Sequence, residues 1–203
     1  MKARFDERAK DWDTPLKMIR ANKIAEFMKK KLTFKGSLKG LEYGCGTGLL
    51  SFALLSQFQQ ITLADSSEGM LKVLEEKIRA SGTKKMTPIL LDLMEDPPPA
   101  AHFDLIYSLL TFHHVPDTER ILNIFHSILT DEGEICIVDL DKEDGSFHGE
   151  NLQVHHGFDR RELEEKAEKA GFQKIRFETC HSIKKEARGE LQEFPLFMMI
   201  AQK

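Results

Sequence analysis

The chain has 203 residues and a formal net charge of −4, so it is long enough to bury a sizeable core, and its acidic balance disfavours nonspecific attraction to nucleic-acid phosphates. Its three cysteines form no Cys-x-x-Cys pair of the kind used in zinc or redox sites, and no apolar run approaches the roughly 18 residues that a membrane span requires. We therefore expect one cytoplasmic domain over residues 1–203 with no nucleic-acid or membrane partner. The sequence makes no prediction of an oligomeric state.

Residues 1–35 are expected to be helical. Apolar residues recur at helical spacing between Met18 and Leu32, which predicts a helix there. Ahead of it, residues 4–13 combine phenylalanine and the only tryptophan, Trp12, with many charged side chains. Taken alone, this composition predicts a solvated amphipathic helix that packs its two aromatic side chains on the outside of the next helix.

Three glycines, Gly44, Gly46 and Gly48, stand between an apolar segment and a helix-like one in the stretch LEYGCGTGLLS. The first strand, expected over residues 37–43, therefore leads into a glycine turn. Glycine tolerates positive φ and lets a ligand approach the backbone, so such a turn exposes amide donors at a helix start. A tight strand-to-helix turn that binds no ligand is the alternative.

The second strand, QITLA, ends in an acidic residue, Asp65. This is the spacing after a glycine turn at which a carboxylate meets the two hydroxyls of a ribose. In the dinucleotide fingerprint the last glycine falls three residues after the second, whereas here Gly46 and Gly48 are two apart and Leu49 takes that position. The pattern therefore favours a ribose-bearing cofactor other than a dinucleotide.

The rest of the chain alternates helix and strand patterns, which is typical of a doubly wound α/β fold with helices on both faces of a parallel sheet. We find no internal repeat and no linker that would mark a second domain. The expected helices cover residues 49–57, 67–81, 117–130 and 159–170, the last ending at Gly171. The expected strands cover residues 86–91, 103–108, 134–140, 172–180 and 194–201, with a turn region before the last.

Four segments of the chain resemble, in order, the successive motifs of class I S-adenosylmethionine-dependent methyltransferases. They are LEYGCGTG, TLADSS, FDLIYSLLTFHHVPD and LTDEGEICIVDLD. The likeness runs from about residue 38 to residue 137, continues more loosely to the C-terminus, and is nearest to the small-molecule, ubiquinone-biosynthesis-like subgroup. It implies a Rossmann-like sheet, mostly parallel with a last antiparallel strand. It also implies S-adenosyl-L-methionine as cofactor, S-adenosyl-L-homocysteine as product and a small-molecule methyl acceptor.

The resemblance also assigns residues to the cofactor. The glycine turn would wrap its methionine end, Glu42 would lie beside its amino group, and Asp65 would hold its ribose. Asp92 matches the position that contacts the adenine, although LLDLMED stands where many relatives carry a glycine–aspartate pair. The full expected set is Glu42, Gly44, Cys45, Gly46, Gly48, Asp65, Ser66, Met70, Asp92, Leu93 and Ser108.

Ligands in sheets of this kind bind beyond the carboxyl ends of the strands, which places the segment SLLTFHHVPD in the site. By resemblance this segment passes under the transferable methyl group. Histidine titrates near neutrality and suits a base that removes a proton from a hydroxyl or amine, so His113 is the catalytic candidate. The alternative is that it only braces the helix that begins near Asp117. The expected acceptor-binding residues are Trp12, His113 and His156.

The loop over residues 141–158, DKEDGSFHGENLQVHHGF, is long, polar and rich in glycine and histidine. Long loops inside compact domains tend to be lids or binding loops. In relatives, a stretch like residues 5–12 folds over the cofactor as a cover, so residues 1–35 would form a helical cover on a core over residues 36–203. We expect the loop and this stretch to close together over an acceptor pocket floored by residues 108–114.

The reaction that the resemblance implies needs no nucleophile or metal from the protein, because the sulfonium already activates its methyl group. No metal is expected, since His155 and His156 are adjacent, point in different directions in regular structure, and lack a ligand spacing with His148. Two other classes stay open. One is a catalytically silent, methyltransferase-like binding subunit. The other is a nicotinamide-dependent oxidoreductase, which the glycine spacing and the lack of a Tyr-x-x-x-Lys pair disfavour.

Overall fold

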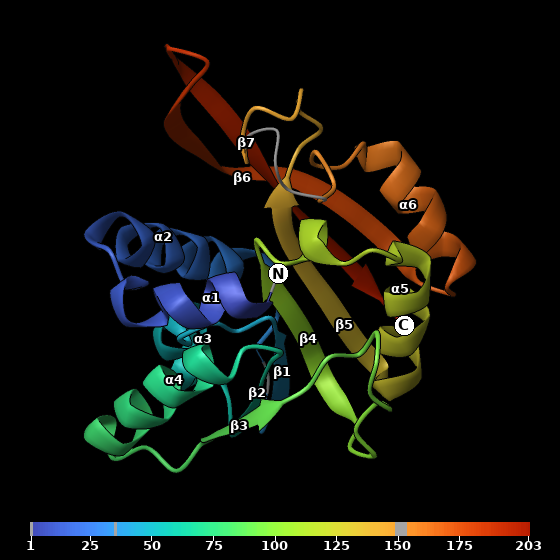
Figure 1. Ribbon diagram of the computed structural model, residues 1–203. Coiled ribbons are helices and arrows are strands. Elements are labelled where there is room, and N and C mark those ends of the chain that lie inside the picture. The colour runs from blue at the N-terminus through green and yellow to red at the C-terminus, as the bar shows by residue number, and fades with distance from the viewer. Residues whose placement is uncertain (1, 35, 149–153) are drawn as a thin grey trace.

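A seven-stranded sheet lies between two layers of helices in the computed structural model, which describes residues 2–34, 36–148 and 154–203 (Figure 1). The strand order is β3-β2-β1-β4-β5-β7-β6. The first five strands are parallel, whereas β7 runs antiparallel to both β5 and β6. The strands are β1 (Lys39–Tyr43), β2 (Gln60–Asp65), β3 (Met86–Leu90), β4 (Phe103–Leu109), β5 (Leu129–Leu140), β6 (Gln173–Ala187) and β7 (Glu190–Gln202).

The helices divide between the two faces of the sheet. Apolar side chains of α2, α3 and α4 pack into one buried cluster, and those of α5 and α6 pack into the other. The predicted doubly wound fold, mostly parallel with an antiparallel last strand, is therefore confirmed. The helices are α1 (Lys2–Arg8), α2 (Pro15–Lys31), α3 (Leu49–Leu54), α4 (Glu68–Ser81), α5 (Thr118–Ile128) and α6 (Arg160–Lys169).

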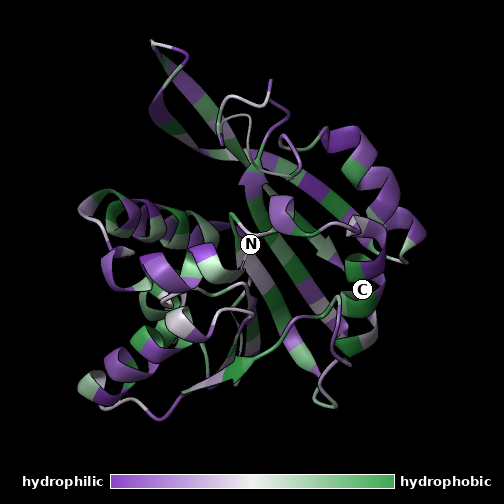
Figure 2. Ribbon diagram, viewed as in Figure 1, coloured by the Kyte–Doolittle hydropathy of each residue, from purple (hydrophilic) through white to green (hydrophobic). Residues whose placement is uncertain are grey.

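The core follows from the periodicity of these elements. In α5 the apolar positions Ile121, Leu122 and Phe125 fall on one face and are fully buried, with the Phe125 ring packed edge-on against Tyr43 of β1. Each such side chain contributes roughly 1.5–3 kcal/mol when it leaves water. The central strands are largely hydrophobic, while the outer helices also carry hydrophilic residues (Figure 2). Within the described residues, no helix combines the length and apolar character needed to cross a membrane.

Side-chain caps place the helix starts where the sequence predicts them. The Ser67 hydroxyl accepts a hydrogen bond from the Met70 amide at the start of α4, and Asp159 accepts from two amides at the start of α6. Capping groups of this kind contribute about 1 kcal/mol each. After α6, Gly171 has a φ of 99°, the left-handed conformation predicted for it.

Two regions differ from the prediction. Helix α5 ends at Ile128 and β5 begins at once, five residues earlier than expected, so the polar residues after it belong to a strand. Strands β6 and β7 absorb the expected turn region and form a long hairpin. Its turn is Arg188 and Gly189, both with positive φ as two-residue hairpin turns require. The arms near this turn are too polar to show strand alternation in the sequence.

Candidate functional site

A cavity of about 870 Å³ opens at the carboxyl ends of the parallel strands. Its walls come from the turns after β1, β2, β3 and β4, and residues of α1, Trp12 and residues of α2 complete its rim. Strand β1 pairs with β2 on one side and β4 on the other, so the chain spreads in both directions from this point. Open α/β sheets bind ligands at such a switch point.

The backbone of the glycine turn has the conformation that the sequence predicts. Gly44, Gly46 and Gly48 all have positive φ, and a Cβ at Gly44 would lie 2.1 Å from the side chain of Thr111. A Cβ at Gly46 would meet nothing closer than Trp12 Nε1, at 3.6 Å. Gly46 is therefore the position where a ligand has room to approach the backbone.

Four amides of this turn, those of Gly44, Cys45, Gly46 and Gly48, are bonded within the protein, although the sequence predicts exposed donors here. The Gly44 and Cys45 amides both donate to the Ala64 carbonyl, and the Gly48 amide donates to the Cys45 carbonyl. The β1–β2 hydrogen bonding thus continues past the strand into the turn. The turn provides space more than donors.

Asp65 ends β2 and lines the cavity. One carboxylate oxygen accepts from the Gly46 amide at 2.7 Å, and the other accepts from the Ser67 amide at 2.9 Å. Burial raises the pKa of Asp65, while these backbone hydrogen bonds oppose the rise. Each carboxylate oxygen can accept a second hydrogen bond, so the group ties two turns together and keeps capacity for a ligand.

Glu42 is buried at the end of β1 beside the cavity. It accepts a hydrogen bond from the Ser51 hydroxyl, which is itself 2.6 Å from the hydroxyl of Tyr107. Burial raises the pKa of Glu42 to about 8. The carboxyl group is therefore mostly protonated at neutral pH, and a cation placed beside it would favour its charged form.

The N-terminal segment lies over the cavity and is fastened to the core. The Asp6 carboxylate accepts from the Ser67 hydroxyl at 2.6 Å and from the Gly69 amide at 2.8 Å, and these hydrogen bonds lower its pKa. Asp13 accepts from the Thr47 hydroxyl of the glycine turn and pairs with Lys77 of α4 at 2.7 Å. The segment does not simply pack on the outside of α2.

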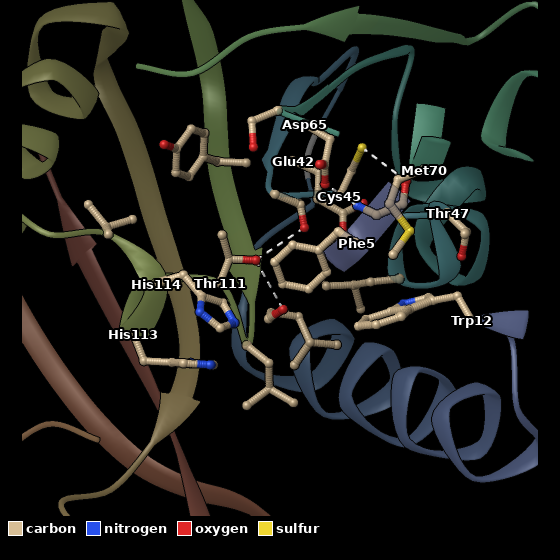
Figure 3. A pocket seen from close by; sticks show the side chains of 18 of the residues that line it. Phe5, Trp12, Glu42, Cys45, Thr47, Asp65, Met70, Thr111, His113 and His114 are labelled. Atoms are coloured by element: carbon tan, nitrogen blue, oxygen red, sulfur yellow. Dashed lines mark hydrogen bonds between the residues drawn. The ribbon is translucent and has the colours of Figure 1, made fainter. Parts of the chain in front are cut away.

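Aromatic rings cross the cavity from the glycine turn to the loop after β4. The Phe5 ring packs edge-on against Trp12, with centroids 5.7 Å apart, and against His114, with centroids 5.4 Å apart. Figure 3 shows Phe5 between the histidine pair on one side and Cys45 and Met70 on the other. The rings of Trp12, Phe5 and His114 thus divide the cavity into two parts. We call them the glycine-turn end and the histidine end.

Basic side chains from α2 line the glycine-turn end. The Lys17 ammonium lies 3.2 Å from the centre of the Trp12 ring. Burial, together with nearby Arg8 and Arg20, lowers the pKa of Lys17 to about 8. The buried Nε of Arg20 has no hydrogen-bond partner among the described residues. These groups favour an anionic ligand at this end.

Three histidines meet at the other end. His113 is buried, and its Nδ1 lies 2.6 Å from a carboxylate oxygen of Asp139, which β5 also buries. Its Nε2 lies 2.8 Å from Nε2 of His148. The ring of His114 is 4.0 Å from that of His113, centre to centre. Burial lowers the pKa of His114 to about 3 and that of His148 to about 4, so both rings are neutral at physiological pH.

Most of the residues predicted from the sequence come together in this cavity. Trp12 and His113 line it. The cofactor candidates that line it are Glu42, Gly44, Cys45, Gly46, Asp65, Ser66, Met70 and Asp92. Both ring nitrogens of His113 already have protein partners, so it is less open to an acceptor than a free base would be.

Four predicted site residues lie outside the cavity lining. Gly48 packs against Leu74, and Leu93 is buried in the core. Ser108 is buried and does not line the cavity, whereas the next residue of β4, Leu109, does. The two differ because neighbouring residues of a strand face opposite sides of a sheet. His156 is exposed, with its ring against Gly145.

The sequence did not reveal Lys17, Arg20 and His148 of the cavity wall, nor Asp139, which lies behind the wall against His113. Lys17 and Arg20 look like the polar face of a helix, and Asp139 looks like one more residue of a buried strand. His148 was considered only with the histidine pair further along its loop. The sequence offered only a weak signal for these residues. Each is a polar residue inside a segment that is otherwise typical of a helix, a strand or a loop. Residues 149–153 of that loop lie outside the described residues.

Comparison with known proteins agrees with this geometry. The profile of a methyltransferase domain family matches residues 41–133. A methyltransferase of Schizosaccharomyces pombe, named as uncharacterised, is 30% identical over 139 residues, which cover 61% of this chain and 49% of that protein. A ubiquinone biosynthesis O-methyltransferase of Marinobacter nauticus is 27% identical over 157 residues, which cover 71% of this chain and 63% of that enzyme. Residues 41–133 of this chain thus match a methyltransferase domain.

Solved structures with the same fold cover 90% of this chain. Phosphoethanolamine N-methyltransferase 2 of Haemonchus contortus superposes with a TM-score of 0.72 at 18% identity, covering 90% of this chain and 52% of that one. The [4+2]-cyclase SpnF superposes with a TM-score of 0.72 at 15% identity, covering 90% of this chain and 80% of that one. The chain thus spans about half the length of the first curated relative, and its fold is also found in a cyclase.

Proposed function

We propose that this protein is an S-adenosylmethionine-dependent methyltransferase that acts on a small-molecule acceptor. The observation that carries the proposal is the cavity at the switch point, where the glycine turn and Asp65 meet inside a methyltransferase domain. Structures of the Haemonchus relative hold S-adenosylmethionine or S-adenosylhomocysteine. The volume of the cavity in this protein also lies within the roughly 300–1,000 Å³ typical of small-molecule sites.

The lining residues suit the parts of this cofactor. Asp65 has spare acceptor capacity for the ribose hydroxyls, and Gly46 leaves room for the methionine chain. Glu42 would lie beside the cofactor's ammonium. Asp92, with Leu91 and Met94 on the same wall, would meet the adenine.

The carboxylate of the cofactor would lie at the basic end of the cavity. Among the described residues, Arg20 carries a buried nitrogen without a partner, and burial together with nearby Arg8 and Arg20 lowers the pKa of Lys17. An anion placed between them would supply the missing partner and offset the repulsion between the two cations. These two residues are our addition to the cofactor-binding set.

The acceptor would bind at the histidine end. Leu109, Leu110 and Phe147 give this end an apolar wall, and His114 and Lys185 add polar groups. When bound, the cofactor supplies a methyl group that its sulfonium has already activated. The protein then has to orient the acceptor and exclude water, which the covering N-terminal segment serves.

The second candidate is a protein that does not transfer a methyl group, such as a catalytically silent binding subunit, because the same fold is found in a protein named as a [4+2]-cyclase and not as a methyltransferase. Two measurements separate the candidates. Titration calorimetry with S-adenosylhomocysteine tests the cofactor site, and transfer of labelled methyl from the cofactor to a panel of phenols, carboxylic acids, amines and thiols tests catalysis. Binding with transfer supports an enzyme, binding without transfer to any acceptor supports a silent subunit, and no heat at millimolar ligand rejects both.

We also propose that residues 1–203 act as one unit, with residues 1–35 as the cover and residues 36–203 as the core. The ties from Asp6 to the start of α4 and from Asp13 to the glycine turn support this division. A cytoplasmic location remains part of the proposal. It is supported by the three cysteines, all of which are free thiols in the structure.

A further inference from the structure

We propose that His113, His114 and His148 bind a divalent transition-metal ion at the histidine end of the cavity. The three rings come from two segments, the loop after β4 and the loop after β5, and all three line the cavity. Among the described residues they are the one group of this kind whose possible ligand atoms lie within 4.8 Å of one another. We infer further that the ion binds the acceptor, and this second part rests on the proposed function.

The distances suit a coordination site after small side-chain rotations. With zinc–nitrogen bonds of about 2.0–2.1 Å, the nitrogens of a tetrahedral site lie about 3.3 Å apart. Here the Nε2 atoms of His113 and His148 are 2.8 Å apart, and the widest separation in the group is within 4.8 Å. An ion would spread the close pair slightly and draw the third ring inward. His148 lies on a loop, where such a shift is readily made.

Asp139 completes the arrangement from behind. Its carboxylate is fully buried and accepts from the His113 backbone amide as well as lying 2.6 Å from Nδ1 of the same residue. When Nδ1–H donates to this carboxylate, the lone pair on Nε2 faces His148 and the cavity. Histidines that bind metals in proteins are oriented by a carboxylate in the same way.

His114 provides an independent observation. Its buried Nδ1 has no hydrogen-bond partner among the described residues, although its ring lies beside both other histidines. A buried polar atom without a partner is unfavourable and calls for an explanation. Binding of an ion by the three histidines would explain why the His114 imidazole is buried here without a partner for its Nδ1 among the described residues.

The donor set indicates the class of ion and leaves it a free position. Three imidazole nitrogens suit zinc, cobalt, nickel, copper or ferrous iron rather than magnesium or calcium. Three protein ligands leave one tetrahedral position open, and in zinc enzymes that position takes water or substrate. At this end of the cavity, the open position faces the space that we assign to the acceptor.

Such an ion would replace a general base. An acceptor hydroxyl bound at the open position loses its proton to bulk water more readily, because the cation stabilises the oxygen anion. That oxygen then forms a bond to the methyl carbon while the carbon–sulfur bond breaks, and the electron pair of that bond stays on sulfur as S-adenosylhomocysteine. This arrangement is consistent with His113, whose two ring nitrogens face Asp139 and His148 rather than an acceptor.

The test is cobalt binding to the metal-free protein, followed by visible absorption and by metal analysis after dialysis. We expect one Co²⁺ per chain with the strong absorption of a four-coordinate site. Asp139 would only orient a ligand, so Asp139→Asn should weaken cobalt binding by ~10–100-fold. His148 would be a ligand itself, so His148→Ala should weaken cobalt binding by more than that. The matched control is His156→Ala, an exposed histidine of the same loop outside the cavity lining, which should bind cobalt like the unaltered protein.

The proposal is overturned if the unaltered protein retains no stoichiometric metal or if His148→Ala binds it equally well, since the histidines would then be only a hydrogen-bonded cluster. Calorimetry with S-adenosylhomocysteine on His148→Ala separates this result from the proposed function, because the glycine turn is intact there. Metal binding without any binding of that ligand would keep the metal site and reject its role toward an acceptor. Loss of methyl transfer on chelation, restored by zinc, would support that role.

Discussion

The two ends of the cavity are built in different ways. The glycine-turn end is formed by the tips of β1, β2 and β3, whose positions follow from continuous parallel pairing. The histidine end brings together His113 and His148 from separate loops and Asp139 from the carboxyl end of β5. If the proposed function holds, the sheet sets the cofactor end and loops set the acceptor end, which would let one scaffold keep its cofactor while its acceptors vary.

The largest effect should come from filling the glycine-turn end. Gly46→Leu places a side chain where a ligand would approach the backbone, so binding of S-adenosylhomocysteine should disappear from titration calorimetry. Gly82→Leu is the matched control, because Gly82 also has a positive φ and open space but ends α4 away from the cavity. If both variants lose binding equally, backbone strain is the cause and Gly46 has no special place in the site.

The next effect tests the ribose assignment. Asp65→Ala should weaken the cofactor by about 1.5–3 kcal/mol, the range for hydrogen bonds to a charged partner. The exposed Asp131 supplies a control variant, Asp131→Ala, with the same change of charge. Thermal melting must accompany the titration, since Asp65 also accepts from the Gly46 and Ser67 amides. An unchanged dissociation constant in a folded Asp65→Ala protein would place the ribose elsewhere.

Titration against pH sharpens the comparison further. Glu42 is mostly protonated below its pKa of about 8, and an ammonium beside it favours the carboxylate, so binding of the cofactor should release a proton. Affinity should then rise with pH by at most about tenfold per unit and stop rising near pH 8. In Glu42→Gln this slope should vanish. A slope that persists in the variant would come from another group.

The smallest effect concerns the cover at the histidine end. Hydrogen exchange should slow in residues 2–12 and at the two ends of the loop over residues 141–158 when S-adenosylhomocysteine binds, because closure excludes water. Core strands serve as the internal control. If only the glycine turn becomes protected, these segments do not close together and the acceptor end stays open to solvent.

How well the sequence predicted each end reflects the same contrast. Gly46 and Asp65 stand at fixed spacings after strands, so local pattern was enough to find them. The meeting of His148 with His113 depends on the path of a long loop, and Asp139 is one residue in a run of buried strand, so no spacing encoded either one. Ser108 was one residue away from the cavity wall, and in a strand one residue reverses the face.

The fold itself followed from periodicity, except where polar residues form strands. The arms of the β6–β7 hairpin near Arg188 are held by pairing with each other, which leaves no apolar alternation to read. Four amides of the glycine turn that the sequence predicts to be free are bonded within the protein. Two of its amides share the Ala64 carbonyl, a contact between strands that cannot be seen in either segment alone.

Helix α1 and the last residue, Lys203, lie at opposite ends of the parallel strands, and this has a practical consequence for protein engineering. Helix α1 forms part of the cavity rim (Figure 1). Strand β7 ends beside Glu134, at the end of the sheet away from the cavity, where the Lys203 amide donates to the Gly133 carbonyl. A purification tag placed next to the start of α1 would crowd the mouth through which ligands enter. Tags, fluorophores or surface attachment at the last residue should leave that entrance clear.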